Sequence, residues 1–206
     1  MAERPTLVGL TGSIGMGKTE TAKMFAALGI PVFDADAAVH ALYEPGGAAV
    51  AVVGEAFPGT VKDGRVDRQA MVARVMNDPA AFARLEAIVH PLVAMEEKNF
   101  IDEAWAKDAP LVILDIPMLY ETGGEARMDA VVVVSAPAEV QRARVLARPG
   151  MTAQRLDHIL SRQMSDAEKR RRAHFVVDTG RGFDHAFEQA KRIVQELLLK
   201  RDAKHA

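Results

Sequence analysis

Eight consecutive residues near the start of the chain have the types and spacing of a phosphate-binding loop. The run that matches the pattern G-x-x-x-x-G-K-S/T is Gly12-Ser13-Ile14-Gly15-Met16-Gly17-Lys18-Thr19. Glycines let such a loop curl so that its N–H groups point at anionic oxygens, and the start of a following helix adds partial positive charge. Lys18 is expected to reach the β- and γ-phosphates of ATP, and the Thr19 hydroxyl to bind Mg²⁺.

Two acidic positions could complete the chemistry of phosphoryl transfer. Asp34-Ala35-Asp36 closes a short apolar segment, which we expect to form a strand beside the one before the loop, so that both carboxylates face the γ-phosphate. Asp36 is the favoured catalytic group, orienting the acceptor hydroxyl or accepting its proton, while the alternative is an N-cap of the next helix. Asp115 follows four apolar residues and is predicted to hold Mg²⁺, the alternative being a turn cap.

Arginines cluster in the third quarter of the chain. The members of this cluster are Arg142, Arg144, Arg148, Arg155 and Arg162. Because arginines neutralise charge on a transferring phosphoryl group, residues 144–170 are predicted to form a lid, with Arg144 and Arg148 as catalytic residues. A solvated helix face is the alternative. The run Lys169-Arg170-Arg171-Arg172 is interpreted as such a solvated face near the lid, not as a nucleic-acid site.

The elements that must position these residues alternate between strands and helices. Apolar runs that do not alternate with polar residues predict buried strands at Thr6–Leu10, Ile30–Asp34, Leu111–Asp115, Ala130–Ser135 and His174–Asp178. Helical spacing predicts a first helix from Lys18 to Leu28, stopped by Gly29, and a last helix from Phe183 to Lys200. The fold class is therefore α/β, a three-layer sandwich around a five-stranded parallel sheet.

The stretch from residue 37 to residue 107 differs from the rest, because it contains no strong buried strand. We predict a helical insert there, with Asp67 and Asp78 as N-caps and Pro79 in a first helical turn. Such a crossover is far longer than one helix requires, and long insertions of this kind usually bind something. The predicted domains are a nucleotide-binding core of residues 1–36 and 108–206 and an acceptor-binding insert of residues 37–107.

Composition limits the possible partners. The 206 residues carry a net charge of −2, so no global field draws the protein to nucleic acid or a membrane. The chain has no cysteine, which excludes thiolate nucleophiles and zinc–thiolate sites. No window approaches the roughly 20 apolar residues of a membrane helix. The first residues do not resemble a signal peptide. We expect a cytoplasmic protein that is a monomer or weak homo-oligomer.

Several classes of nucleotide-binding protein remain open at this point. The guanine-binding sequence N-K-x-D of translational-type GTPases does not occur in the chain. A short chain with an insert favours a small-molecule or nucleotide kinase, including nucleoside monophosphate and small-alcohol kinases. The alternatives are a regulatory protein that holds nucleotide without transferring phosphate, and a nucleic-acid-binding module, against which the lack of a basic excess argues.

The order of the motifs resembles the dephospho-coenzyme A kinase family along nearly the whole chain. The matching segments are Gly9-Leu10-Thr11-Gly12, Ile14-Gly15, Gly17-Lys18-Thr19, Leu28-Gly29, Asp34-Ala35-Asp36, Gly64-Arg65-Val66-Asp67-Arg68, Leu85-Glu86-Ala87-Ile88-Val89-His90-Pro91, Asp115-Ile116-Pro117-Met118-Leu119-Tyr120-Glu121, Gln141 with Arg144 and Arg148, and Arg162-Gln163. The resemblance implies transfer of phosphate from ATP to the ribose 3′-hydroxyl of dephospho-coenzyme A, the last step of coenzyme A synthesis.

The resemblance also implies residue roles. Asp36 matches the family's catalytic aspartate, and Arg144 and Arg148 match lid residues near the phosphates. The residues that match the acceptor-binding lobe are Asp67, Arg68, His90 and Pro91, with Asp34 and Asp36 beside them. His90 could equally serve packing between lobes.

The sequence departs from the family in the loop and after the last strand. The family loop usually reads T-G-G-I-G-S-G-K, whereas this chain has Ser13 and Met16, and Met16 is expected to remove a hydroxyl near the phosphates. After the fifth strand the family often has Asn before Gly, and this chain has Thr179-Gly180.

Overall fold

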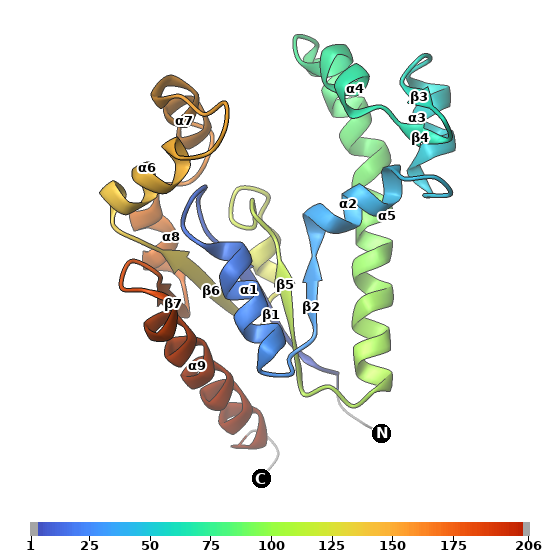
Figure 1. Ribbon diagram of the computed structural model, residues 1–206. Helices are drawn as coiled ribbons and strands as arrows, with labels where there is room; N and C mark the ends of the chain where they lie inside the picture. Colours follow the sequence, from blue (N-terminus) through green and yellow to red (C-terminus); the bar gives the residue numbers. More distant parts are fainter. Residues whose placement is uncertain (1–3, 204–206) are drawn as a thin grey trace. The chain divides into compact units, whose positions relative to one another are not determined.

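The structure is a computed structural model that describes residues 4–203 (Figure 1). The elements follow in the order β1 (Thr6–Thr11), α1 (Lys18–Ala27), β2 (Val32–Asp34), α2 (Ala35–Tyr43), α3 (Ala49–Ala56), β3 (Val61–Lys62), β4 (Arg65–Val66), α4 (Arg68–Val75), α5 (Pro79–Ala106), β5 (Leu111–Asp115), the short 3₁₀ helix η1 (Gly124–Arg127), β6 (Ala130–Ser135), α6 (Ala138–Leu146), α7 (Ala153–Leu160), α8 (Asp166–Arg172), β7 (Phe175–Asp178) and α9 (Phe183–Ala203). Contacts divide the described chain into a core unit, up to Phe33 and from Ala104 onward, and an insert unit, Asp34–Glu103.

The predicted five-stranded sheet is confirmed. Its strands lie in the order β2-β5-β1-β6-β7, and β1 pairs in parallel with both β5 and β6, while β6 pairs in parallel with β7. The registers place Thr6 opposite Leu111 and Val8 opposite Ala130. All five residues of β5 and all six of β6 are buried, as their uninterrupted apolar sequences require.

The predicted place of the second strand was wrong. We expected β2 beside β1, but β5 lies between them, and the N–H of Ile113 donates to the carbonyl of Pro31 at the junction of β2 and β5. Adjacency of consecutive strands is only a tendency. β5 is apolar throughout and suits the centre of the sheet, whereas β2 has only three residues and ends on exposed Asp34, which suits an edge.

Helices cover both faces of the sheet in the core unit, giving the predicted three layers (Figure 1). On one face, alternate strand residues pack against α1 and α9, and this cluster includes Val8, Leu10, Ile113, Val132, Phe25 and Ile193. On the other face, Val131 and Val133 pack with Leu119 and Tyr120 from the segment after β5. α8 lies beside β6.

The end of α1 and the bounds of α9 follow the sequence signals. α1 stops at Ala27, and Gly29 follows with a φ of 81°, a left-handed conformation that favours glycine after a helix. α9 begins at Phe183, as predicted, and continues to Ala203. None of the helices in residues 4–203 has the length and apolar character needed to cross a membrane.

The insert unit has a small core of its own. Its buried residues are Leu42, Ala49, Val53, Phe57, Val66 and Met71, and partly buried side chains of α5 pack against them. The predicted N-caps are confirmed, since Asp67 accepts from the N–H groups of Gln69 and Ala70 and Asp78 accepts from that of Ala81. α5 begins at Pro79 and runs for 28 residues through Pro91.

A two-stranded antiparallel ribbon in the insert unit was not predicted. β3 and β4 pair Val61 with Val66 and Lys62 with Arg65. The turn between them consists of Asp63 and Gly64, both with positive φ, which is the geometry of a tight hairpin turn. Strands of two residues are too short to leave a periodic signal in the sequence.

Candidate functional site

The phosphate-binding loop joins β1 to α1 and depends on its glycines. Gly15 and Gly17 have φ angles of 78° and 95°, which residues with side chains rarely adopt. A Cβ at Gly15 would lie 2.4 Å from a methyl group of Val145, and one at Gly12 would lie 2.7 Å from the carbonyl oxygen of Val134. The loop therefore packs closely on α6 and β6, and its shape is fixed by the fold around it.

Met16 has a packing role that the sequence did not indicate. Its side chain is only 2% exposed and packs in the cluster beneath α1 and α9, while the expected loss of a hydroxyl near the phosphates stays a prediction. Its Sδ atom lies 3.1 Å from the backbone N of Ala136 and accepts a hydrogen bond from that N–H. The side chain thus anchors the loop to the end of β6.

Lys18 and Asp115 form an ion pair at the start of α1. Asp115 is 2% exposed at the end of β5, and the Lys18 Nζ donates to its Oδ1. Thr19 is in the first turn of α1, next to Lys18. Mg²⁺ is usually bound by only one or two protein oxygen atoms, together with water and substrate phosphates. The carboxylate of Asp115 and the hydroxyl of Thr19 are oxygen ligands of this kind, so these residues fit the ion.

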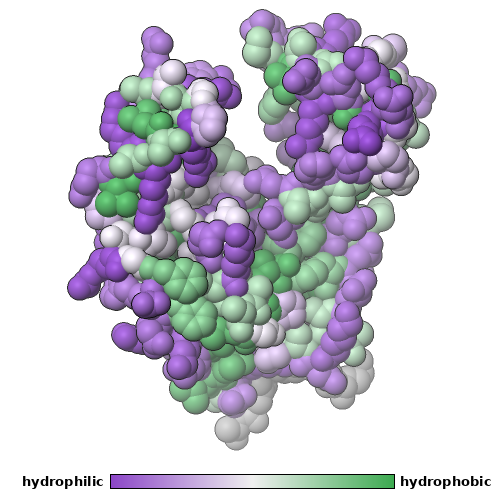
Figure 2. All heavy atoms as spheres, in the orientation of Figure 1, coloured by the Kyte–Doolittle hydropathy of each residue, from purple (hydrophilic) through white to green (hydrophobic). Residues whose placement is uncertain are grey.

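A pocket of about 370 Å³ opens beside the loop within the core unit. Its lining residues are Gly15, Gly17, Glu20, Thr21, Met24, Arg144, Arg148, Thr179, Gly182, Phe183 and Ala186. Hydrophobic side chains gather over the start of α9 on this face (Figure 2). Phe183 is 59% exposed and stacks on Phe187, with ring centroids 6.1 Å apart.

Arg144 is held against the wall of this pocket beside the loop. Its guanidinium donates to the hydroxyl of Thr179 at 2.9 Å and to the carbonyl of Thr179 at 2.7 Å. Thr179 in turn donates its hydroxyl to the carbonyl of Met16 at 2.6 Å. Arg148, just after the end of α6, is exposed and lines the same pocket. Thr179 thus links Arg144 to the loop.

The interpretation of the basic run 169–172 as a solvated face was wrong for Lys169, whereas Arg170, Arg171 and Arg172 are exposed. Lys169 is completely buried, and its Nζ lies 2.9 Å from Oε1 of Glu121. Arg172 pairs with Glu125, and its guanidinium lies 4.7 Å from the centre of the Tyr120 ring. Burial raises the pKa of the Tyr120 hydroxyl. The structure turns these two cations toward carboxylates distant in sequence, which the local charge pattern does not reveal.

Asp34, the last residue of β2, and Asp36 have different surroundings in the insert unit. Asp34 caps α2, because its Oδ1 accepts from the N–H of Ala37 at 2.9 Å. Asp36 lies in the first turn of α2, is exposed, and makes no hydrogen bond or ion pair with any residue between 4 and 203. The N-cap alternative therefore describes Asp34, and Asp36 remains available for another role.

A second pocket of about 370 Å³ lies wholly within the insert unit. Its lining residues are His40, Glu44, Lys62, Asp63, Arg65, Val66, Asp67, Arg68 and Gln69. Lys62 donates a hydrogen bond to Asp67 at 2.9 Å. This bond, together with the N–H groups that Asp67 caps, lowers the pKa of the Asp67 carboxyl. The same bond raises the pKa of Lys62. Arg65 lies 3.5 Å from Glu44. Lys62, Arg65 and Arg68 are all exposed in this insert pocket.

His90 and Pro91 lie on α5, away from the lining of the insert pocket. The His90 side chain is 68% exposed, and its Nε2 is 3.9 Å from Glu86, one turn back along the helix. The role of His90 stays a prediction.

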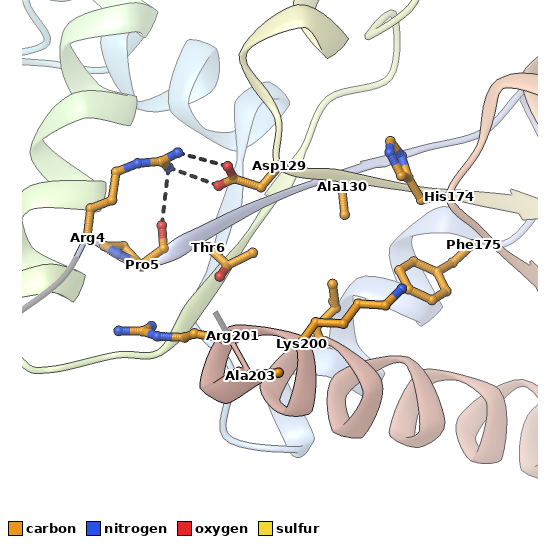
Figure 3. A pocket seen from close by; sticks show the side chains of 11 residues that line it. Arg4, Pro5, Thr6, Asp129, Ala130, His174, Phe175, Lys200, Arg201 and Ala203 are labelled. Atoms are coloured by element: carbon orange, nitrogen blue, oxygen red, sulfur yellow. Dashed lines mark hydrogen bonds and ion pairs between the residues drawn. The ribbon is translucent and has the colours of Figure 1, made fainter. Parts of the chain in front are cut away.

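A pocket of about 530 Å³ lies at the amino ends of β1, β6 and β7, the opposite edge of the sheet from the loop (Figure 3). Its charged groups are already engaged: Arg4 pairs with Asp129 at 2.8 Å, Lys200 pairs with Glu196 at 2.6 Å, and Arg201 donates to the carbonyl of Pro110. None of the predicted site residues lines it, so it is not the candidate site.

Sequence reasoning missed several residues that line the two candidate pockets. Thr179 and Phe183 in the core unit and Lys62 in the insert unit were not singled out for a role. The position of Thr179 directly after β7 is a signal that could have identified it, because ligands bind at the carboxyl ends of parallel strands. Phe183 and Lys62 carry no such local signal.

Comparisons with known proteins agree with this geometry. A family model described as dephospho-CoA kinase matches residues 6–184. The dephospho-CoA kinase of Rhodopseudomonas palustris strain HaA2 is 55% identical over 188 residues, 91% of this chain and 94% of that protein. The dephospho-CoA kinase of Mesorhizobium japonicum is 55% identical over 191 residues, 93% of this chain and 96% of that protein.

Solved structures share the fold. The structure of a Thermus thermophilus protein has a TM-score of 0.80 and 35% identity, covering 94% of this chain and 98% of that one. The dephospho-CoA kinase of Campylobacter jejuni has a TM-score of 0.66 and covers 94% of this chain and 97% of its own. Its 18% identity supports the fold alone.

Proposed function

Because the chain belongs to the dephospho-CoA kinase family, we propose that it transfers the γ-phosphoryl group of ATP to the ribose 3′-hydroxyl of dephospho-coenzyme A. The products are coenzyme A and ADP, and the reaction is the last step of coenzyme A biosynthesis. The observation that carries the proposal is the loop 12–19, with Lys18 at its end paired to the buried carboxylate of Asp115. A loop of this shape binds the phosphates of a nucleotide.

The core unit supplies the groups that bind ATP. The loop N–H groups and Lys18 bind the β- and γ-phosphates, and the pairing of Lys18 with Asp115 keeps the ammonium at the loop before ATP binds. Thr19 and Asp115 would hold Mg²⁺. When bound, the ion offsets negative charge on the phosphates.

The pocket beside the loop is the proposed site of the adenine base. Met24 and Phe183 offer it apolar surface, and Phe183 already stacks on Phe187. Arg144 and Arg148 line the same pocket, and we assign to them the neutralisation of phosphate charge as the lid closes and excludes water. The contacts of Arg144 to Thr179 fix its guanidinium in advance.

The insert unit is the proposed acceptor-binding part. Dephospho-coenzyme A carries a diphosphate, and the insert pocket presents the cations Lys62, Arg65 and Arg68. Asp67 shapes this pocket by capping α4, and Asp34 caps α2. His90 and Pro91 are assigned to the acceptor only through the family resemblance.

Asp36 is the proposed catalytic residue. Asp36 follows β2, a strand of the five-stranded sheet, by two residues, and it matches the catalytic aspartate of the family that the chain resembles. Its carboxylate would orient the attacking hydroxyl and accept the proton that this hydroxyl loses when its oxygen bonds to phosphorus. The absence of hydrogen-bond partners within residues 4–203 leaves both carboxylate oxygens available.

The direct test measures ADP formation from ATP with and without dephospho-coenzyme A. We expect ADP only when the acceptor is present, with phosphate on the 3′-hydroxyl of the product. A panel of nucleoside monophosphates and small alcohols separates this function from that of a related kinase. ATP binding without turnover of any acceptor would contradict the proposal and favour a regulatory protein.

The cytoplasmic location and the monomeric or weakly associated state also belong to this proposal. They stay predictions, and fractionation of cells and sedimentation of the purified protein test them. Titration with polynucleotide at low salt tests the expected lack of nucleic-acid binding.

A further inference from the structure

We propose that Gln141 and Gln163 are positioning residues that fix the phosphate-binding loop by hydrogen bonding to the backbone C=O and N–H groups of Ile14. The Nε2 of Gln141 donates to the carbonyl of Ile14 at 2.8 Å. The N–H of Ile14 donates to Oε1 of Gln163 at 3.2 Å. Two side chains thus engage the only two polar backbone groups of one loop residue. We call this arrangement the glutamine clamp.

The partners fix the orientation of both side-chain amides. A backbone carbonyl can only accept and a backbone N–H can only donate, so Gln141 must present its nitrogen and Gln163 its oxygen. Gln141 is 7% exposed, and its own backbone carbonyl lies 3.2 Å from the Cβ that a side chain at Gly15 would have. Gln141 therefore acts from a helix, α6, that already packs on the loop.

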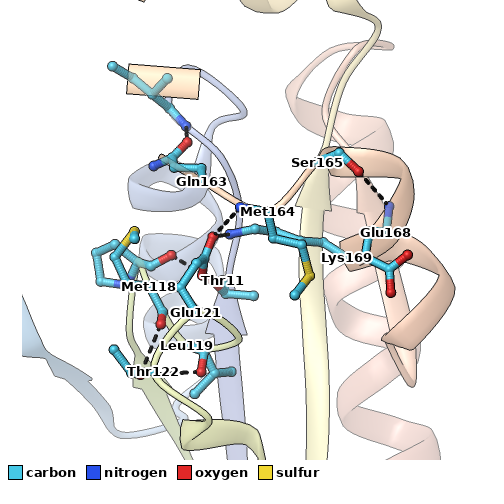
Figure 4. A network of polar contacts seen from close by, with 12 residues as sticks. Thr11, Met118, Leu119, Glu121, Thr122, Gln163, Met164, Ser165, Glu168 and Lys169 are labelled. Carbon is cyan, nitrogen blue, oxygen red and sulfur yellow. Dashed lines mark hydrogen bonds and ion pairs between the residues drawn. The ribbon is translucent and has the colours of Figure 1, made fainter. Parts of the chain in front are cut away.

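The other half of the clamp is held by a buried ion pair, drawn in Figure 4. Gln163 lies in the connection between α7 and α8, and the N–H of the next residue, Met164, donates to Oε1 of Glu121 at 2.8 Å. The same oxygen lies 2.9 Å from Nζ of Lys169, which is completely buried. Glu121 follows β5 by a short turn, so the pair fastens the α7–α8 connection to the core of the sheet.

This arrangement explains why a charged lysine is buried in α8. Burying an ammonium group costs free energy unless a carboxylate compensates its charge. Because a buried ion pair adds little net stability, the pair is expected to have another structural role. The structural consequence of the pair is to set the position of Met164 and hence of its neighbour Gln163. Of the two clamp residues, Gln141 in α6 precedes the predicted lid of residues 144–170, and Gln163 lies within it, after α7. A movement that opens that segment would therefore directly disturb the hydrogen bonds to the backbone of Ile14.

A loop fixed in this way loses less conformational freedom when phosphate binds, and that saving raises phosphate affinity. The effect should be confined to the phosphate part of a ligand. The clamp proposal rests on nucleotide binding by the loop, which is part of the proposed function. If the unmodified protein does not bind ADP, the proposed function fails; if it binds ADP and the clamp variants bind it equally well, only the clamp fails.

The test compares three substitutions of the same kind: Gln163→Met, Gln141→Met and the control Gln154→Met, an exposed position of α7. Methionine keeps the length of the side chain and removes the amide. Affinity for ADP is measured by calorimetry, and affinity for adenosine by competition. Each clamp variant should lose about threefold to tenfold in ADP affinity, the equivalent of one hydrogen bond. Adenosine affinity should not change, and the control should match the unmodified protein.

Two outcomes would overturn the proposal. Tighter ADP binding by Gln163→Met would mean that its oxygen competes with phosphate for the Ile14 N–H. Equal losses for ADP and adenosine would mean that the substitution damages the whole pocket and that the glutamines have no specific effect on the loop.

The ion pair is tested through its coupling to Gln163. Lys169→Met should give the same selective loss of ADP affinity, and adding Gln163→Met to it should cause little further loss, because both changes release the same connection. Losses that multiply would place Lys169 outside the clamp. If Lys169→Met does not fold, Glu121→Gln replaces it, since the amide oxygen can still accept from Met164 while the charge is removed.

Discussion

The core unit and the insert unit present their candidate site residues in opposite ways. In the core unit, Lys18, Asp115 and Arg144 are half-buried or buried and are held by contacts to distant parts of the chain. In the insert unit, Asp36 and Arg68 are exposed at the starts of helices. The difference indicates that Lys18, Asp115 and Arg144 are held in place before a ligand binds, whereas Asp36 and Arg68 still face solvent.

The largest expected effect is a loss of activity without a loss of stability, caused by a substitution in the insert unit. Asp36→Asn should lower kcat by about 100- to 10,000-fold, the usual contribution of a positioned proton acceptor. The KM for ATP should change little, and the free energy of unfolding should stay within about 0.5 kcal/mol, because the side chain is exposed and unpartnered within residues 4–203. Steady-state kinetics and urea unfolding measure both quantities.

The matched control is Asp78→Asn, in the same unit and of the same chemistry. Asparagine caps helices as well as aspartate does, so α5 should keep its start and turnover should be normal. Normal turnover by Asp36→Asn would remove Asp36 from the mechanism.

A change in the core unit should affect activity and stability together. Lys18→Met leaves the buried Asp115 carboxylate without its ammonium, which should cost about 1–3 kcal/mol of unfolding free energy. ADP affinity should fall at least tenfold, since the same ammonium serves the phosphates. Calorimetry and urea unfolding test the pair of effects.

Lys23→Met is the control for that change, because Lys23 is an exposed lysine of the same helix that pairs only at the surface with Glu20. Its effect on stability should be below about 1 kcal/mol. A Lys18 variant that loses affinity without losing stability would show that the ion pair with Asp115 does not support the fold, and would weaken the contrast between the units.

A smaller effect should be specific for the acceptor. Arg68→Ala removes a cation from the insert pocket and should raise the KM for dephospho-coenzyme A about tenfold, the equivalent of one charge-assisted hydrogen bond, with the KM for ATP unchanged. Arg74→Ala, at an exposed position of the same helix outside the pocket lining, is the control. An equal rise for ATP and acceptor would argue against separate binding parts.

The smallest effect concerns the pH dependence of the insert unit. The pKa of Asp67 lies below its ordinary value, mainly because Lys62 donates a hydrogen bond to it. A carboxyl with a lowered folded pKa stabilises the fold above its unfolded pKa of about 3.9, and that contribution disappears as pH falls through the folded value. The unmodified protein should therefore be slightly more stable than Asp67→Asn at about pH 6, and the difference should vanish toward about pH 2.

Urea unfolding of both proteins across that range measures the difference. Asparagine retains the cap, so the comparison isolates the charge of Asp67. A difference that grows as pH falls would reverse the sign and refute the assignment of this pKa shift.

Much of the core unit could be predicted from sequence, because strands buried on both faces of a parallel sheet have uninterrupted apolar runs. Leu111–Asp115 and Ala130–Ser135 were placed to the residue. The order of the strands could not be predicted, since nothing local in β2 or β5 specifies which one pairs with β1.

Long-range pairing also limits what sequence reveals about the site. Lys169 stands in a run of four cations that looks solvated, and only the fold brings it to Glu121. The N-caps of the insert unit were predictable for the opposite reason. Asp67 and Asp78 accept hydrogen bonds from residues two or three positions further along the chain. The residues that form each cap are therefore all visible in one short stretch of sequence.

Met16 shows why a motif position that accepts any residue should not be treated as free in a particular protein. The motif leaves this position open to any residue, yet here its thioether fills part of the interior and bonds to Ala136. Replacing such a side chain by a smaller one leaves a void that costs about 2–5 kcal/mol for methionine to alanine. In this chain, a position free in the consensus is constrained by the architecture, and restoring the usual family serine there would be a disruptive substitution, not a conservative one.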